Sequence, residues 1–134
     1  MTRRINRLIV AASSLSCLVA LTTAAGAYDG DWKRGRLYYQ GVCTPCHKAT
    51  AKPEGIPAND YTIAEWNAYL AADKHARGKD TIKQYVSQSY RAEIKAKNKV
   101  ADRLFSASDQ DLLLDVKAFV VNGAKDGDAP AGCN

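Results

Sequence analysis

The sequence is short of several side chains that metal and catalytic sites often use. Its 134 residues include one methionine, Met1, and two histidines, His47 and His75. It has no internal repeat and no low-complexity tract, which excludes repeat and fibrous architectures. Because 46% of the residues are hydrophobic and 25% are charged, we predict one globular domain.

The first 27 residues differ in composition from the rest of the chain. Three arginines and no acidic residue precede an apolar run over 8–24, and small residues follow at Ala25 and Ala27. These features are typical of a cleavable secretory signal peptide over 1–27. We therefore expect cleavage after Ala27 and a periplasmic or otherwise exported protein.

Two other uses of this leader stay open. The apolar run could remain as a membrane anchor, although it is near the lower length limit for a bilayer span and contains Ser and Thr. A lipid anchor at Cys17 is the second alternative, and the residues around Cys17 are a poor match to a lipoprotein signal. With cleavage, we expect no stable membrane insertion.

Cleavage would change the charge and the ligand supply of the mature chain. The full chain has 19 basic and 14 acidic residues, and the leader holds three of the basic ones. The remaining net charge of +2 is too small to indicate nucleic-acid binding, which needs a concentrated basic face. Loss of Met1 also removes the chain's single methionine, and with it the thioether sulfur of that side chain.

Three cysteines remain after cleavage, and two of them belong to one short motif. Cys43-Thr44-Pro45-Cys46-His47 has the C-x-x-C-H pattern of c-type haem attachment. Two thiols at this spacing can bond to the two vinyl groups of one haem, and the adjacent histidine can supply an axial nitrogen to iron. The sequence thus predicts one haem c, with thioether bonds to Cys43 and Cys46 and with His47 as the proximal iron ligand.

Three other interpretations of the motif stay open. A Cys-x-Pro-Cys sequence is also typical of thioredoxin-like redox pairs, but those follow a buried strand, whereas 31–42 is charged and helix-like. A zinc site could recruit His75 and Cys133, although their spacing matches no common zinc pattern. A plain disulfide between the two motif cysteines would be strained and would leave His47 without a role.

Helical signals account for the mature chain, and no segment is a convincing strand. We expect a helix over 29–42, a loop over 48–59 and then a helix that starts with a Thr62/Glu65 capping box and stops near Gly78. One or two helices should follow over 80–104, with Asp80 as the first cap. The last helix should be capped by Ser106 or Ser108 and end at Gly123. We therefore predict an all-α domain over 28–134, with a flexible tail over 124–134.

At its two ends the mature chain resembles the class I cytochrome c family. The first helix of that family carries a glycine, an aromatic residue four positions later and the first haem cysteine four beyond that, which match Gly35, Tyr39 and Cys43. Val116 and Phe119 match the apolar and aromatic residues of the family's last helix. The resemblance implies a cytochrome c-like bundle of about four helices wrapped around one covalent haem, with the first and last helices crossing at the glycine.

The resemblance also concerns the loop after the motif. Gly55 and Pro57 look like the family's loop whose carbonyl orients the axial histidine, and Pro57 is the better candidate. The chain departs from the family in the second axial ligand, which is usually a methionine placed before the last helix.

The second iron ligand must therefore differ from that of the family. His75 is the first candidate for a distal ligand. The alternative is that His75 is an ordinary solvated histidine on the surface. Lys97, Asn98 and Lys99 stand where the family's methionine would fall, and the site could also be open. Cys133 is a weaker candidate and could instead contact another chain. Two imidazole ligands would give a low reduction potential compared with a methionine ligand.

The expected function is one-electron transfer between redox protein partners, without catalysis on a substrate. A basic run could attract acidic partners, or it could be a solvated helix face: Arg91, Lys95, Lys97, Lys99 and Arg103. The other functions left open are a haem protein that binds NO, CO or an anion, an electron-relay subunit of a larger redox complex, and a disulfide oxidoreductase.

Overall fold

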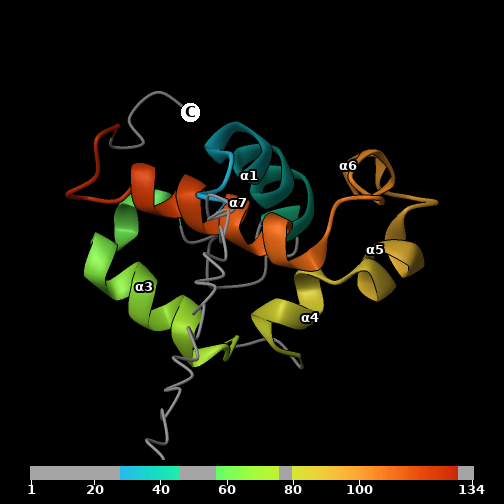
Figure 1. The fold of residues 1–134 in the computed structure, drawn as a ribbon, viewed down its shortest axis with the longest axis horizontal. Coiled ribbons are helices and arrows are strands. Elements are labelled where there is room, and N and C mark those ends of the chain that lie inside the picture. Colours follow the sequence, from blue (N-terminus) through green and yellow to red (C-terminus); the bar gives the residue numbers. More distant parts are fainter. Residues whose placement is uncertain (1–27, 46–56, 76–79, 130–134) are drawn as a thin grey trace, which may run out of the picture.

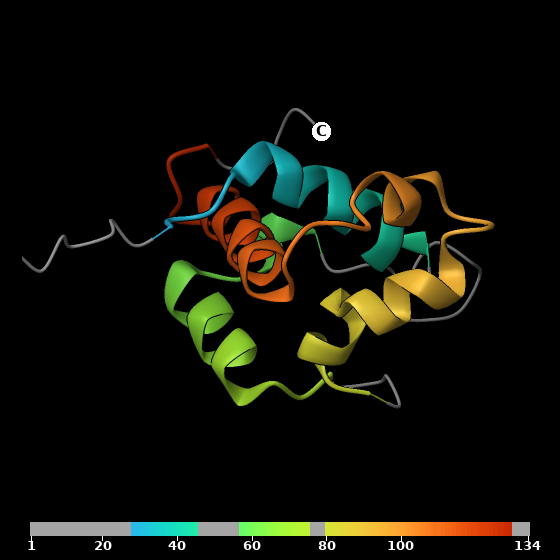
Figure 2. The ribbon, with the colours of Figure 1, turned by 45° about the vertical axis from the view of Figure 1, so that its right-hand side comes forward.

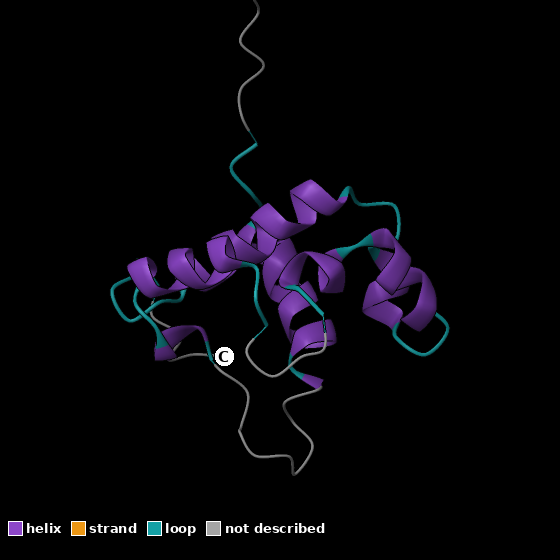
Figure 3. Ribbon diagram, turned by 90° about the horizontal axis from the view of Figure 1, so that it is seen from below, coloured by secondary structure: helices purple, strands orange, loops and turns teal. Residues whose placement is uncertain are grey.

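The computed structural model describes residues 28–45, 57–75 and 80–129, and these residues form helices joined by loops, with no strand among them (Figure 3). The helical elements are α1 Trp32–Tyr38, the π-helical turn η1 Tyr39–Cys43, the 3-10 turn η2 Ala58–Asp60, α3 Ile63–Ala72, α4 Ile82–Val86, α5 Gln88–Ile94, α6 Lys99–Arg103 and α7 Asp109–Asn122. The predicted all-α class is confirmed. In these three ranges, no helix is both long and apolar enough to cross a bilayer.

Helices α1 and α7 lie against each other (Figures 1 and 2). A Cβ on Gly35 would overlap the carbonyl oxygen of Asp115 and lie 2.9 Å from the amide nitrogen of Val116. The absent side chain therefore lets the two backbones touch. Nearby, the rings of Tyr39 and Phe119 pack with their centroids 5.3 Å apart. These contacts agree with the crossing that the resemblance implies for Gly35.

A buried carboxylate fastens the start of α1 to α7. Asp115 is 0% exposed, and it accepts hydrogen bonds from Arg34 Nε, the Tyr28 hydroxyl and the backbone N–H of Asp31. A buried charge needs such partners because it has lost its hydration. Asp31 caps α1 through bonds from two backbone amides, so the helix begins later than the predicted residue 29.

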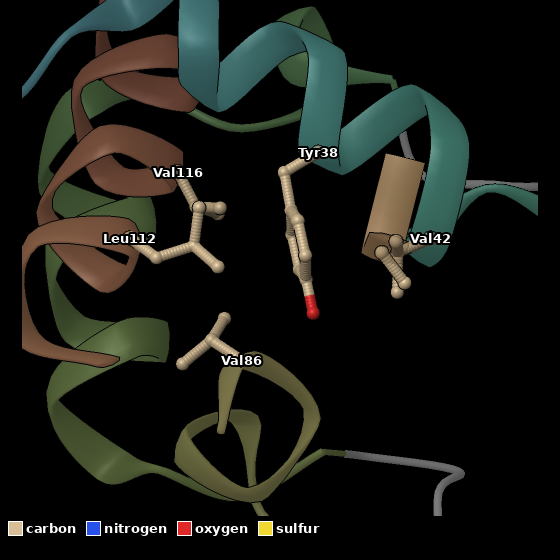
Figure 4. Packing of buried hydrophobic residues seen from close by; sticks show 6 residues of the cluster. Tyr38, Val42, Val86, Leu112 and Val116 are labelled. Carbon is tan, nitrogen blue, oxygen red and sulfur yellow. The ribbon is translucent and has the colours of Figure 1, made fainter. Parts of the chain in front are cut away.

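The apolar core consists of two clusters along α7. The Tyr38 cluster packs the first half of α7 against α1, η1, α4 and α6 (Figure 4), and its buried members are Tyr38, Val42, Val86, Ala101, Leu112 and Val116. The Trp66 cluster packs the second half against η2 and α3, and its buried members are Ala58, Trp66, Phe119, Val120 and Ala124. Both clusters therefore depend on the position of α7.

Helix α3 begins as predicted and ends early. The Thr62 hydroxyl accepts from the N–H of Glu65, and the Glu65 carboxylate accepts from the N–H of Thr62 at 2.8 Å. This confirms the capping box. The helix ends at Ala72 rather than near Gly78, because Asp73 takes a left-handed conformation with φ of 49°.

The segment 80–104 forms three short helices instead of one or two. Thr81, not Asp80, caps α4. Ser87 has an extended backbone, ends α4 and caps α5 with its hydroxyl. Asn98 caps α6, so a break near Asn98 is confirmed and the break at Ser87 is an addition.

Arg91 does not belong to the exposed basic face that was predicted. Its side chain is 0% exposed, and its guanidinium donates to the carbonyls of Val86, Phe105 and Ala107 and to the Asp109 carboxylate. It therefore joins α5 to the start of α7 instead of facing solvent. The other four basic residues are exposed: Lys95, Lys97, Lys99 and Arg103.

Helix α7 has the predicted ends, with Ser108 as its N-cap and Gly123 as its C-cap. The segment after it, 124–129, is the described part of the expected tail. Residues 124–129 fold back on α3, where the N–H of Lys125 donates to Tyr61 O at 3.0 Å and Asp126 accepts from the N–H of Ile63 at 2.7 Å. The rest of the expected tail, 130–134, lies outside the described residues, as does the expected leader.

Candidate functional site

The structure describes the first cysteine of the motif and the candidate distal histidine. Cys43 is the last residue of η1 and is half-buried against the Tyr38 cluster. His75 lies three residues after the end of α3. Cys46, His47, Gly55 and Cys133 are outside the described residues, so their predicted roles stay predictions.

The backbone before the motif widens from an α-helix into a π-helical turn. The backbone N–H of Thr44 donates to Tyr39 O, five residues back, at 2.9 Å. The hydroxyl of Thr44 donates to Gln40 O at 2.7 Å. Single π turns inside helices are frequent at functional sites. Cys43 thus follows a helix, and it lacks the preceding strand that a thioredoxin-like pair requires.

The surroundings of Cys43 are aromatic and of low polarity. Burial raises the pKa of Tyr38 and of Tyr39 far above the ordinary value, and the negative charge of Cys43 in its thiolate form raises both further. Both phenols therefore stay neutral. The Tyr38 hydroxyl donates to the carbonyl of Tyr85 at 2.6 Å, which links the last residue of α1 to α4.

His75 lies on the α4 side of this region and is half-buried rather than fully solvated. Its ring centroid is 5.3 Å from that of Tyr85, and Tyr85 packs edge-on against Tyr90 at 5.1 Å. The Nδ1 atom of His75 is buried. The Tyr85 carbonyl also accepts from Tyr38, which belongs to the cluster on which Cys43 packs, so α4 contacts both His75 and the core cluster that contacts Cys43.

The other candidate ligands differ in their availability. Lys97 and Lys99 are exposed. Asn98 donates through Nδ2 to Gly41 O at 2.8 Å, and its Oδ1 accepts from the backbone amides of Val100 and Ala101. These bonds use the oxygen that would bind iron, which argues against Asn98 as a ligand. Its cap role was visible in the sequence as an Asn between two helical segments, whereas its bond to Gly41 was not.

Pro57 begins the described chain after the motif and is exposed. Its carbonyl accepts from the N–H of Asp60 at 3.0 Å. A carbonyl oxygen has two lone pairs, so this bond is compatible with a second one to His47, as predicted.

The side chains that pack on the Tyr38 cluster are largely apolar, as the wall of a porphyrin site must be. Besides Cys43 itself, they include Tyr39, Tyr90, Ile94 and Leu104. Over 28–45, 57–75 and 80–129, no three His, Cys, Asp or Glu residues gather as a metal site. A protein-only zinc centre is therefore not assembled by the described residues.

A separate groove of about 370 Å³ lies where the chain enters α1, and Tyr28, Asn67, Leu114 and Lys117 contribute to its walls. Cys43 lies beyond the opposite end of α1. The groove is therefore distinct from the motif.

Fold and site together define a small helical protein in which a Cys-x-x-Cys-His motif begins where its first helix ends. No protein-family model matches the chain, and neither a curated protein nor a solved structure matches it.

Proposed function

We propose that the chain is an exported monohaem c-type cytochrome that carries single electrons. Cys43 and Cys46 would form the thioether bonds, and His47 would ligate iron from one side. The observation that carries most weight is the position of the motif, which starts eight residues after Gly35 on the helix that crosses α7. The crossing supports the cytochrome c-like bundle that the resemblance implies.

When bound, haem c supplies an iron that gains or loses one electron. The chain's own residues would bind and orient this group and exclude water from most of it. Tyr38 and Tyr39 support this role because Tyr38 is fully buried in the cluster on which Tyr39 and Cys43 pack. No general base or nucleophile is needed, since no substrate bond changes.

We assign the distal ligand to His75. Its buried Nδ1 and its packing on Tyr85 support this choice over the exposed Lys97 and Lys99. Two imidazoles place the reduction potential lower than a histidine and a methionine would. The protein is thus proposed as a low-potential carrier.

The cofactor can be tested by producing the full chain in a host that attaches c-type haem. We expect a coloured protein whose mass exceeds that of the polypeptide by one haem and whose haem resists acid-acetone extraction. A Cys43→Ala/Cys46→Ala variant should lose the covalent haem. Colourless wild-type protein at the bare polypeptide mass would refute the proposal.

The distal ligand can be tested by EPR of the oxidised protein. Wild type should give a low-spin bis-imidazole spectrum, and His75→Ala should lose it, while Lys74→Ala, a neighbouring exposed change, should not. If the reduced wild type binds CO at once, the site is open, and the small-ligand-binding alternative replaces the carrier.

A further inference from the structure

The π turn determines the direction in which the motif leaves the first helix. Each residue added to a helix rotates all later residues by about 100°. The widened turn Tyr39–Cys43 therefore sets the side of the fold toward which Cys43 projects. Whatever holds this turn also holds the motif.

One carbonyl of the turn cannot be satisfied in the usual helical way. In an α-helix, the carbonyl of Gly41 would accept from the amide of residue 45, but residue 45 is Pro45, which has no N–H. Asn98, 57 residues further along the chain, supplies the missing donor through Nδ2 at 2.8 Å.

The same amide group is held from its other side. Asn98 Oδ1 accepts from the amides of Val100 at 3.0 Å and Ala101 at 3.1 Å, and so caps α6. Exchange of the oxygen and nitrogen would break all three bonds, so the orientation of the amide is set by its partners. A five-residue helix such as α6 has little stability of its own and depends on this cap and on its packing.

Glycine at position 41 permits this contact. A Cβ there would lie 2.5 Å from Val100 Cγ2 and 2.8 Å from Val100 Cβ. The side chain of Val100 therefore rests directly on the backbone of the turn. Ala101, the next residue, is fully buried in the Tyr38 cluster, so α6 is anchored in the core and pressed against η1.

We propose that Asn98 is a positioning residue for haem attachment: by bonding to Gly41 O, it holds the π turn that orients Cys43. This inference depends on the proposed function. Asn98 acts through the backbone of the turn and binds neither the haem nor its iron.

Asn98→Asp separates the two tasks of the side chain. Aspartate keeps an oxygen that can cap α6, but it cannot donate to Gly41 O. Ser108→Ala is the control, because it removes the cap of α7 and leaves the turn intact. Both variants are made as full chains in the haem-attaching host.

Hydrogen exchange reports the turn with or without haem. In Asn98→Asp we expect exchange over 39–44 to be about fivefold faster, as the loss of one neutral hydrogen bond implies, with no change within α7. The haem-loaded variant should also show a shifted reduction potential and altered EPR g values. Ser108→Ala should leave both haem properties and the exchange of 39–44 unchanged.

The outcomes separate the two proposals. Suppose that wild type carries haem. The role of Asn98 is then refuted if Asn98→Asp does not change the hydrogen exchange of 39–44, or if it changes neither the reduction potential nor the EPR g values. In either case the proposed function stands. If wild type carries no haem, the proposed function fails and the positioning role fails with it.

Discussion

At residue 35 the first helix has no side chain, and there α1 and α7 make backbone contact. The overlap that a Cβ would have with Asp115 O and its approach to Val116 N involve backbone atoms that cannot rotate away. At this position helix propensity favours alanine over glycine, whereas the tight packing of α1 on α7 favours glycine.

Gly35→Ala distinguishes these demands by the sign of its effect. Propensity alone would stabilise the helix by about 1 kcal/mol, whereas overpacking costs about 1–3 kcal/mol or more. We expect the free energy of unfolding to fall by about 2 kcal/mol in denaturant titrations followed by circular dichroism. A more stable variant would show that the crossing is looser than described.

Arg91 is a second residue whose importance depends on its surroundings. Its guanidinium satisfies carbonyls of Val86, Phe105 and Ala107 at the junction of three segments. In Arg91→Met one buried and two partly buried acceptors lose their donor, so we expect a loss of about 3 kcal/mol in unfolding free energy.

Asp109→Asn is the matched control for Arg91→Met. The Asp109 side chain is 52% exposed, and asparagine keeps the oxygen that accepts from the N–H of Gln88. We expect the control to cost less than about 1 kcal/mol. Equal losses in the two variants would mean that the ion pair, rather than the carbonyl contacts, explains the effect.

At the scale of elements, most of the helices are short and depend on their caps. Side chains of Thr62, Thr81, Ser87, Asn98 and Ser108 each accept a backbone hydrogen bond at the start of a helix. Helix α3 adds a carboxylate to this pattern, since Glu65 accepts from both the N–H and the hydroxyl of Thr62.

The capping box makes α3 sensitive to acid. The bonds from Thr62 lower the pKa of Glu65, so ionised Glu65 stabilises the fold above its unfolded-state pKa. This contribution disappears as the pH falls through the lower folded-state pKa. Between about pH 6 and about pH 3, we expect the Tm of wild type to fall more than that of Glu65→Gln.

Glu93→Gln, an exposed change on α5, serves as the control for the acid effect. Its Tm should follow that of wild type over the same pH range. Parallel curves for wild type and Glu65→Gln would contradict the role of the carboxylate.

At the scale of the whole molecule, exposed basic charge lies close to the motif. Helix α6 carries Lys99 and Arg103, follows Lys97, and is bonded through Asn98 to the turn that ends at Cys43. Burial of Arg91 leaves these three basic residues and Lys95 as the exposed part of the basic run. Charge near an electron-transfer site steers encounters with oppositely charged partners.

On the proposed function, Lys97→Glu/Lys99→Glu should slow the oxidation of the reduced, haem-loaded protein by ferricyanide, an anionic acceptor. We expect a decrease of about tenfold at low salt that vanishes as salt is raised, measured by stopped-flow absorbance. The control is Lys33→Glu/Lys117→Glu, which makes the same charge change at exposed residues of α1 and α7. Equal slowing in both variants would show that net charge acts and that its position does not.

The sequence by itself determined the helical class, the capping box of α3 and both ends of α7. Each of these features depends on residues three or four positions apart, so it can be read from local spacing. The residues proposed to carry the haem were also identified in this way, because the motif is contiguous in the chain.

Only the tertiary structure decided the rest. Asp115 and Arg91 belong to residue types that are usually exposed, and both are buried by partners on other segments. The bond from Asn98 to Gly41 and the docking of residues 124–129 on α3 likewise join distant parts of the chain. Such contacts follow from how helices pack in three dimensions, and spacing along the chain does not encode that packing.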